Sequence, residues 1–167
     1  TMILTGHAIQ KNVEKGRITL EPFDVGAINP NSYNYHLGAE LLVLEPGEVA
    51  PGSRYRRIQI PREGYMLQPG RLYLGQTFEK IGSRYYTTTL IGRSTMGRLG
   101  LWLQVTADLG HIGAEHHWTL EMKVVQPLRL YAGMPIGQVS FWRNFGRATQ
   151  KYSGKYAADT KPQTSKQ

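Results

Sequence analysis

The segment from Gly92 to Gly100 carries the residue types of a phosphate-binding site. It contains two arginines, two hydroxyl side chains and three glycines: Gly92, Arg93, Ser94, Thr95, Gly97, Arg98 and Gly100. Glycines let backbone N–H groups approach an anion, a helical turn after Ser94 aims its N-terminus at it, and arginine offers several planar donors. The same residues also fit a capped helical turn on the surface, so the segment alone leaves both interpretations open.

A second candidate for chemistry is Glu121, in a stretch that alternates between apolar and polar residues. Trp118 and Leu120 fall on one face of the expected strand, whereas Glu121 falls on the other, with Thr119 and Lys123 beside it. A carboxylate in this place is either an exposed residue of the outer face or a pocket residue. In a pocket, partial burial and a hydrogen-bonded neighbour would tune it for proton transfer.

Four neighbouring residues, His111, Glu115, His116 and His117, raise the question of a metal. Adjacent histidines on a strand point to opposite faces, and the spacing matches no standard zinc pattern. We therefore expect no metal held by the protein.

The elements that must position these residues belong to one small domain. The chain has 167 residues, 40% of them hydrophobic, and no cysteine, which excludes a disulfide scaffold and a thiolate zinc site. It shows neither a secretory signal pattern nor an apolar run of membrane-spanning length, so we expect a cytoplasmic protein without a membrane partner.

The formal net charge of +8 favours a polyanionic partner, although solubility and a basic C-terminal stretch explain it equally well. No basic run with interleaved aromatic residues marks a nucleic-acid surface. A small phosphorylated ligand is the better expectation.

Periodicity predicts one short N-terminal helix, capped by Thr5 and ended by Gly16, followed by many short strands. Gly and Pro turns separate the expected strands, which cover residues 17–20, 33–44, 65–68, 72–77, 85–91, 101–106, 118–124, 128–130 and 136–142. This pattern is typical of a sandwich, jelly roll or barrel. Apolar residues thin out after Phe145. We therefore expect a β domain over residues 1–145 and a C-terminal tail or flexible lid over 146–167.

The chain resembles the dCTP deaminases of the trimeric dUTPase-like superfamily along nearly its whole length. The resemblance rests on the segment 92–101, on Val105-Thr106-Ala107, and on Thr119-Leu120-Glu121. Further matching stretches are 2–5 with 8–9, 29–33, 37–38, 130–138 and 152–156.

The resemblance implies a distorted jelly-roll β-barrel that forms a homotrimer, with active sites at the subunit interfaces. The reaction would be a metal-independent hydrolytic deamination, in which dCTP gives dUTP and ammonia. Glu121 would be the general acid/base, Ser94 and the carbonyl of Ala107 would hold the attacking water, and Arg98 would keep the carboxylate ionised.

The resemblance also assigns the binding of the substrate. Arg93, Ser94, Thr95 and Lys155 would bind the phosphates, and the backbone around Trp118, Thr119 and Leu120 would read the base. The remaining substrate-site positions are Arg98, His111, Tyr152 and Asp159. Magnesium would accompany the phosphates without a ligand from the protein.

This chain also departs from the family pattern, which makes it a divergent member. His111 replaces an aspartate that meets the sugar, Ala114 replaces a bulky neighbour of the sugar, and Asn34 replaces another aspartate. In the lid, Ala157, Ala158 and Asp159 stand where a glutamine is expected. We therefore expect a sugar site wide enough for ribonucleotides, and the number of phosphates and modification of the cytosine stay open as well.

Two alternative functions follow from the same residues. A dUTP diphosphatase, or a bifunctional deaminase-diphosphatase, shares the fold but wants an aspartate where this chain has His111. A non-catalytic nucleotide-binding regulator would explain the altered sugar and lid positions, although it would not need Ser94, Arg98, Ala107 and Glu121 together.

Overall fold

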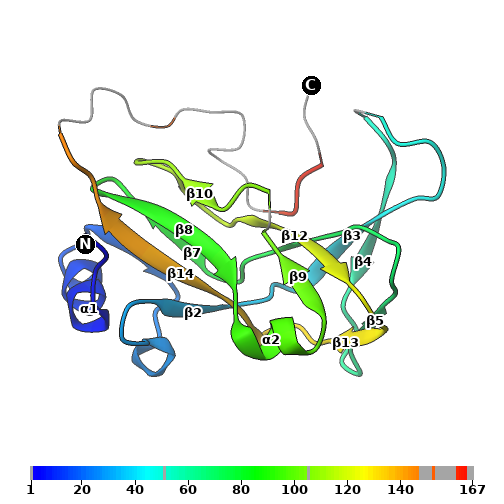
Figure 1. The fold of residues 1–167 in the computed structure, drawn as a ribbon, viewed down its shortest axis with the longest axis horizontal. Helices are drawn as coiled ribbons and strands as arrows, with labels where there is room; N and C mark the ends of the chain where they lie inside the picture. The colour runs from blue at the N-terminus through cyan, green and yellow to red at the C-terminus, as the bar shows by residue number, and fades with distance from the viewer. Residues whose placement is uncertain (1, 51, 105, 147–151, 153–160, 165–167) are drawn as a thin grey trace.

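The computed structural model describes residues 2–50, 52–104, 106–146, 152 and 161–164. It is mostly β, as predicted (Figure 1). The helices are α1 (Gly6–Glu14), the short α2 (Ser94–Arg98) and a 3-10 turn (Val25–Ala27). The strands are β1 (Ile18–Glu21), β2 (Tyr33–His36), β3 (Glu40–Leu44), β4 (Tyr55–Gln59), β5 (Tyr65–Leu67), β6 (Tyr73–Gln76), β7 (Lys80–Ser83), β8 (Tyr86–Gly92), β9 (Leu101–Leu103), β10 (Leu109–Gly110), β11 (Glu115–His116), β12 (Thr119–Val124), β13 (Leu128–Leu130) and β14 (Pro135–Arg143).

The strands form antiparallel sheets that do not close on themselves. The largest has the order β4-β3-β6-β12-β9, and a four-stranded sheet has the order β10-β8-β14-β2. A three-stranded sheet, β1-β7-β11, and the pair β13-β5 complete the arrangement. The predicted barrel is therefore a set of open sheets packed around a shared core.

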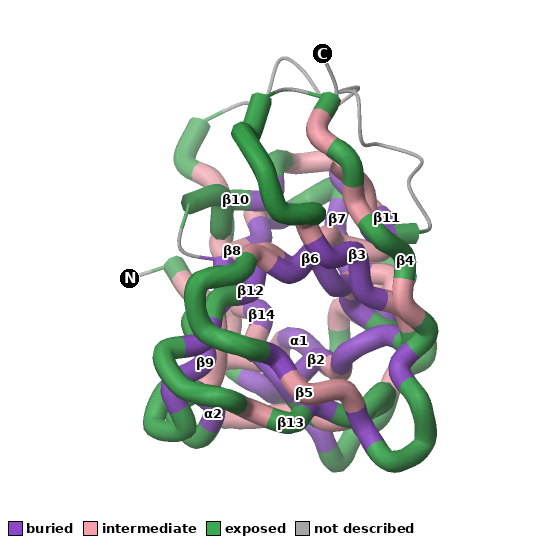
Figure 2. Tube along the Cα trace, turned by 90° about the vertical axis from the view of Figure 1, so that its right-hand side faces the viewer, coloured by how far each residue is buried: buried purple, intermediate pink, exposed green. Residues whose placement is uncertain are grey.

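The core is built by the inward residues of each strand, which appear as buried segments across the sheets in Figure 2. On β12, Leu120, Met122 and Val124 are buried, whereas Glu121 lies between them on the opposite face and is half-buried. This alternation follows from the period of two residues along a strand. It places Glu121 on the face of the largest sheet that points away from the core.

The N-terminal helix begins as the sequence predicts. The side-chain oxygen of Thr5 accepts a hydrogen bond from the backbone N–H of Ala8, and Ile9 is completely buried against the core. Gly16 follows the helix with a positive φ of 64°. Capping and one apolar face therefore suffice to explain this element.

Several strands differ from the sequence prediction. The expected strand 33–44 divides at Leu37 and Gly38, where a side chain on Gly38 would meet Gln76. Strands β4, β7, β10 and β11 were not predicted. β4 carries arginines and lies at the sheet edge, where charged residues are common and apolar alternation is weak. β10 and β11 have only two residues each.

The described parts of the C-terminal stretch lie against the β domain. The backbone N–H of Tyr152 donates to the carbonyl of Ile112 at 2.8 Å, and that of Gln163 donates to the Thr119 hydroxyl at 3.1 Å. A division into residues 1–145 and 146–167 stays a prediction. Within the described residues, no helix is long and apolar enough to span a membrane.

Candidate active site

A cavity of about 950 Å³ lies over the outer face of the largest sheet. Strands β4, β6, β9 and β12 supply its floor, the segment 106–118 supplies one wall, and described residues of the C-terminal stretch also line it. The lining residues are Tyr55, Leu72, Leu74, Trp102, Gln104, Thr106, Ala107, Leu109, His111, Ala114, His116, His117, Trp118, Thr119, Glu121, Lys123, Tyr152, Gln163 and Thr164. The cavity is large enough for a nucleotide.

Glu121 lies on the floor of this cavity, directly opposite Leu74 on β6. It is half-buried, and among the described residues its carboxylate makes no hydrogen bond or ion pair. Burial raises the pKa of Tyr55, and the negative charge of Glu121 raises it further. The sequence left open whether Glu121 is an exposed residue of the outer face or a pocket residue. The structure shows that it is a pocket residue, whose carboxylate is open to a ligand.

Ala107 lines the same cavity as Glu121, and the side chain of Gln104 connects the two residues. Gln104 donates from its Nε2 to the Ala107 carbonyl at 3.2 Å. Its Oε1 accepts the backbone N–H of Glu121 at 2.8 Å. The predicted water-holding carbonyl and the predicted general base therefore belong to one connected local structure.

Trp118, Thr119 and Leu120, which we expected to read the base, differ in whether their backbone N–H and C=O groups are free to bind a ligand. Trp118 donates its N–H to the Thr77 hydroxyl and accepts from the Thr77 N–H, both at 2.9 Å. Leu120 is fully buried and faces Gly75 on β6. By alternation, Thr119 directs its N–H and C=O toward the β9 side, and β9 ends at Leu103, opposite Met122. Thr119 therefore presents an open strand edge to the cavity.

The sugar-site candidates lie at the end of the cavity near the segment 106–118. The rings of His111 and Tyr152 stack with centroids 5.9 Å apart. Ala114 is buried and lines the cavity, as do His116 and Trp118, whose rings pack 4.3 Å apart. The structure thus brings His111, Tyr152, Ala107, Trp118, Thr119 and Glu121 to one cavity.

The glycine- and arginine-rich segment does not reach this cavity. Ser94 to Arg98 form α2, so the predicted helical turn is present, and Arg93 precedes it in an extended conformation. Ser94, Thr95 and Arg98 are exposed, and neither they nor Arg93 lines the cavity. In Figure 1 α2 lies at the end of β8 away from β10. Within one chain, the two halves of the expected site are therefore separate. Lys155 and Asp159 lie outside the described residues.

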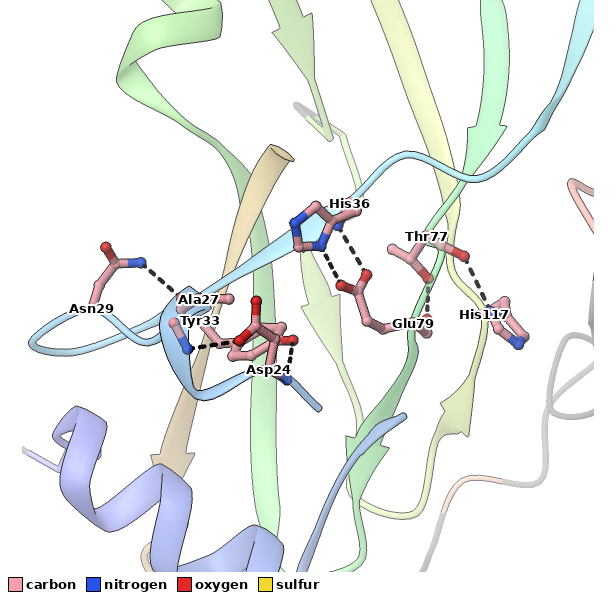
Figure 3. Close-up of polar contacts among 9 residues, drawn as sticks. Asp24, Ala27, Asn29, Tyr33, His36, Thr77, Glu79 and His117 are labelled. Atoms are coloured by element: carbon pink, nitrogen blue, oxygen red, sulfur yellow. Dashed lines mark hydrogen bonds and ion pairs between the residues drawn. The ribbon is translucent and has the colours of Figure 1, made fainter. Parts of the chain in front are cut away.

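A polar network joins β2, the turn after β6 and the residues just before β12 (Figure 3). The buried Thr77 hydroxyl donates to the Glu79 carbonyl at 2.7 Å, and His117 Nδ1 lies 3.1 Å from the Thr77 carbonyl. The buried Glu79 carboxylate contacts His36 Nδ1 at 2.5 Å and accepts the His36 N–H at 2.9 Å. These contacts fix the turn between β6 and β7 against the start of β12.

The histidine-rich segment does not gather metal ligands. Among the described residues, no group of three His, Cys, Asp or Glu side chains is placed to hold a metal ion. Glu115 instead accepts hydrogen bonds from Thr19 at 2.7 Å and Arg84 at 2.9 Å. Burial opposes ionisation of Glu115, but these two hydrogen bonds and the charge of Arg84 lower its pKa.

Sequence reasoning missed several cavity residues. Gln104 lies in the expected strand 101–106, where its polar side chain gave no separate signal. Tyr55 lies on β4. The sequence did not predict this strand, because its charged residues hide the alternation of polar and apolar residues. The alternation already places Lys123 on the face of Glu121, but it gives this lysine no separate role.

Comparison with known proteins identifies the family of this chain. The model of the dCTP deaminase-like family matches residues 3–144. A dCTP deaminase of Rhodopirellula baltica is 45% identical over 93% of this chain and 79% of its own. A protein named dCTP deaminase, dUMP-forming, from Hathewaya histolytica is 42% identical over 98% of this chain and 96% of its own.

A solved structure supports the fold. The crystal structure of a 2'-deoxycytidine 5'-triphosphate deaminase from Agrobacterium tumefaciens matches 86% of this chain with a TM-score of 0.69 and 20% identity. This chain covers 49% of that longer chain. From the family match and the relatives above 40% identity, the chain belongs to the dCTP deaminase-like family.

Proposed function

We propose that this protein is a cytosine-nucleotide deaminase that converts dCTP and water to dUTP and ammonia. The observation that carries this proposal is the placement of Glu121. Its carboxylate has no partner among the described residues, and it lies in a nucleotide-sized cavity with the Ala107 carbonyl. The membership of the chain in the dCTP deaminase-like family supports the same reaction.

Glu121 acts as general base and then as general acid. It takes a proton from a water held by the Ala107 carbonyl, and the hydroxide forms a bond to C4 of the cytosine ring. The C4–N3 double bond opens as the hydroxide adds, and Glu121 then gives the proton to the amino group. The bond between C4 and the amino nitrogen breaks and ammonia leaves as the electron pair on N3 re-forms the C4–N3 double bond. The hydroxyl proton finally moves to N3, which leaves the carbonyl of uracil at C4. Proton transfer of this kind contributes roughly 10²- to 10⁴-fold to a rate.

Thr119 is the residue that we assign to reading the base. Its backbone N–H and C=O face the open edge beyond β9, whereas the corresponding groups of Trp118 are used by Thr77. A donor and an acceptor on one strand edge match the acceptor and donor atoms of a pyrimidine edge. The amino group at C4 then lies on the Glu121 side of the base.

A second copy of the chain supplies the phosphate side of the site. Ser94 and Arg98 are exposed and lie outside the Glu121 cavity, so they serve Glu121 only in a neighbouring subunit. We therefore propose a homotrimer in which this segment of one chain completes the site of the next. Magnesium accompanies the phosphates of the nucleotide, and Arg93, Thr95 and Lys155 bind them.

The sugar site is proposed to be wider than a strict deoxyribonucleotide site. Ala114 presents only a methyl group to the cavity, and His111 stands where the family pattern has an acid. Ammonia release should therefore be compared for dCTP, CTP, dCMP and CMP. Turnover of CTP at a rate comparable to dCTP supports the wide site, and strict preference for dCTP contradicts it.

A bifunctional reaction is the second candidate because several relatives are named dCTP deaminase, dUMP-forming. Formation of dUMP from dCTP also requires release of pyrophosphate. His111 in place of an acid argues against activation of water for attack on phosphorus. Measurement of pyrophosphate beside ammonia separates the products, because a deaminase alone releases none.

The deciding experiment is the Glu121→Gln variant. We expect ammonia release to fall by about 10²- to 10⁴-fold while nucleotide binding persists, because the amide keeps the shape but cannot accept the proton. Glu40→Gln is the matched control, since Glu40 pairs with Arg57 on the same sheet and lies outside the cavity. A parent protein that binds nucleotides but releases no ammonia would instead be a non-catalytic regulator.

A further inference from the structure

Gln104 occupies an unusual position at the end of β9. It is buried, and its φ of 51° is the only positive value at a non-glycine residue among those described. This left-handed conformation is costly for a residue with a long side chain. Its position in the cavity wall suggests that the surrounding contacts maintain it for a reason.

The left-handed turn takes the chain out of the sheet at a defined point. Leu103 is still paired with Met122, but the next residue no longer continues the ladder toward Thr119. The N–H of Gln104 donates to the Glu121 carbonyl at 3.2 Å, and its side-chain Oε1 accepts the Glu121 N–H at 2.8 Å. The side-chain amide thus replaces the backbone acceptor that a continuing strand would offer.

The other end of the same amide holds the opposite wall. Gln104 Nε2 donates to the Ala107 carbonyl at 3.2 Å, across the turn that β9 makes on leaving the sheet. A carbonyl oxygen has two lone pairs, so this bond leaves one for a water. The amide therefore sets the position of the Ala107 oxygen relative to the Glu121 backbone.

We propose that Gln104 is a positioning residue for the deamination. It fixes the water-holding carbonyl against the strand that carries the general base, and it keeps the edge at Thr119 open for the base. This proposal rests on the proposed function and goes beyond it. A misplacement of about 1 Å can lower a rate by about 10²-fold, which is the scale that such a residue controls.

Three variants separate the parts of this role. Gln104→Met keeps the length and removes both hydrogen bonds of the side chain. Gln104→Glu keeps the acceptor for Glu121 but places an acceptor against the Ala107 carbonyl. Gln104→Asn tolerates the positive φ better, yet it is one methylene too short to span both partners.

We expect all three variants to lower kcat by about 10- to 100-fold with KM changed by less than about threefold. The matched control is Gln10→Met, because Gln10 is a glutamine of α1 whose Nε2 donates to the Glu14 carboxylate at 3.1 Å outside the cavity. Its kcat should equal that of the parent. A folded Gln104→Met protein with kcat within about twofold of the parent would overturn the proposal.

A measurement without turnover keeps the two proposals distinguishable. In ¹⁵N-labelled protein, the Glu121 amide proton should move upfield and exchange faster with solvent in Gln104→Met than in the parent. An unchanged Glu121 amide contradicts the positioning role, whether or not the parent deaminates. Absence of ammonia release by the parent with every cytosine nucleotide contradicts the proposed function instead. If Gln104→Met does not fold, Gln104→Asn is measured in the same way.

Discussion

At the scale of single residues, the proposed site depends on the carboxylate of Glu121, which has no partner among the residues that the structure describes. Glu121 comes from an alternating strand whose other face forms the core, so the main chain that carries it is rigid. A hydrogen-bonded partner would hold a carboxylate for structure, as His36 holds the buried carboxylate of Glu79. The open carboxylate of Glu121 is instead available to water and substrate.

The pKa of Tyr55 gives a test of this arrangement. Burial raises it, and the charge of Glu121 raises it further, since a nearby anion disfavours a second one. We expect Glu121→Gln to lower the pKa of Tyr55 toward its ordinary value while leaving it above that value. An NMR titration of ¹³Cζ-labelled tyrosine measures the shift.

Tyr33 is the internal control for that titration. Burial raises its pKa as well, and its charged neighbours are Glu79 and Asp24, not Glu121. Its titration should be unaffected by Glu121→Gln. Equal pKa values for Tyr55 in parent and variant would show that its phenol and the Glu121 carboxylate do not interact.

At the scale of elements, the start of β12 is fixed by the turn between β6 and β7. Thr77 has no exposed surface, and its hydroxyl both donates to the Glu79 carbonyl and accepts from the Trp118 N–H. Thr77→Val has nearly the same shape but leaves these two buried groups unpaired. We expect a loss of about 1–3 kcal/mol in the free energy of unfolding, measured by urea denaturation.

Thr87→Val is the comparison for this loss. Thr87 lies half-buried on β8, where solvent can replace its contact with Asn144. We expect Thr87→Val to lower the free energy of unfolding by less than about 1 kcal/mol. If the two valine variants are equally stable, the buried hydroxyl of Thr77 does not hold the turn.

The three-stranded sheet β1-β7-β11 has a pH-dependent contact. Thr19 on β1 and Arg84 after β7 both donate to Glu115 on β11 and hold its pKa below the ordinary 4.5 despite burial. A lowered folded-state pKa adds stability above the unfolded value, and this stability is lost as the pH falls through the folded value.

We therefore expect Glu115→Gln to be about 1 kcal/mol less stable than the parent at pH 7. The difference should shrink as the pH falls below 4.5 and the parent carboxylate becomes protonated. Urea denaturation at several pH values measures it. A difference that does not vary with pH would exclude the charge of Glu115 as its source.

At the scale of the whole molecule, we propose that a second chain completes the site. Ser94 and Arg98 on α2 are exposed, and Glu121 lies in a separate cavity. If neighbouring subunits complete each other, the particle should have three times the 18.8 kDa of the chain by sedimentation equilibrium. A monomer that deaminates would contradict the shared site.

Complementation tests the shared site directly. Arg98→Ala and Glu121→Gln should each be inactive as uniform trimers, because every site lacks one residue. Refolded together in equal amounts, they form mixed trimers in which about a quarter of the sites contain both native residues. Recovery of about a quarter of the parent activity supports the trimer, and no recovery contradicts it.

The sequence by itself determined the mostly β class, the N-terminal helix with its Thr5 cap, and the two faces of β12. These features depend on local periodicity, capping and turn residues, which neighbouring residues specify. The same information could indicate that Glu121 was either exposed or in a pocket. It could not choose, because the polar face of a strand is compatible both with solvent and with a pocket that distant segments cover.

Tertiary structure decided the rest. Three features require contacts between residues that are distant in the sequence. They are the cavity over Glu121, the open strand edge at Thr119, and the position of the Gln104 amide between two segments. The alternation of polar and apolar residues along one strand carries no information about such contacts. The left-handed turn at Gln104 and the separation of Arg98 from Glu121 depend on how the sheets pack, and no local pattern encodes them. Long-range packing therefore decided which candidate residues share the cavity with Glu121 and which lie outside it.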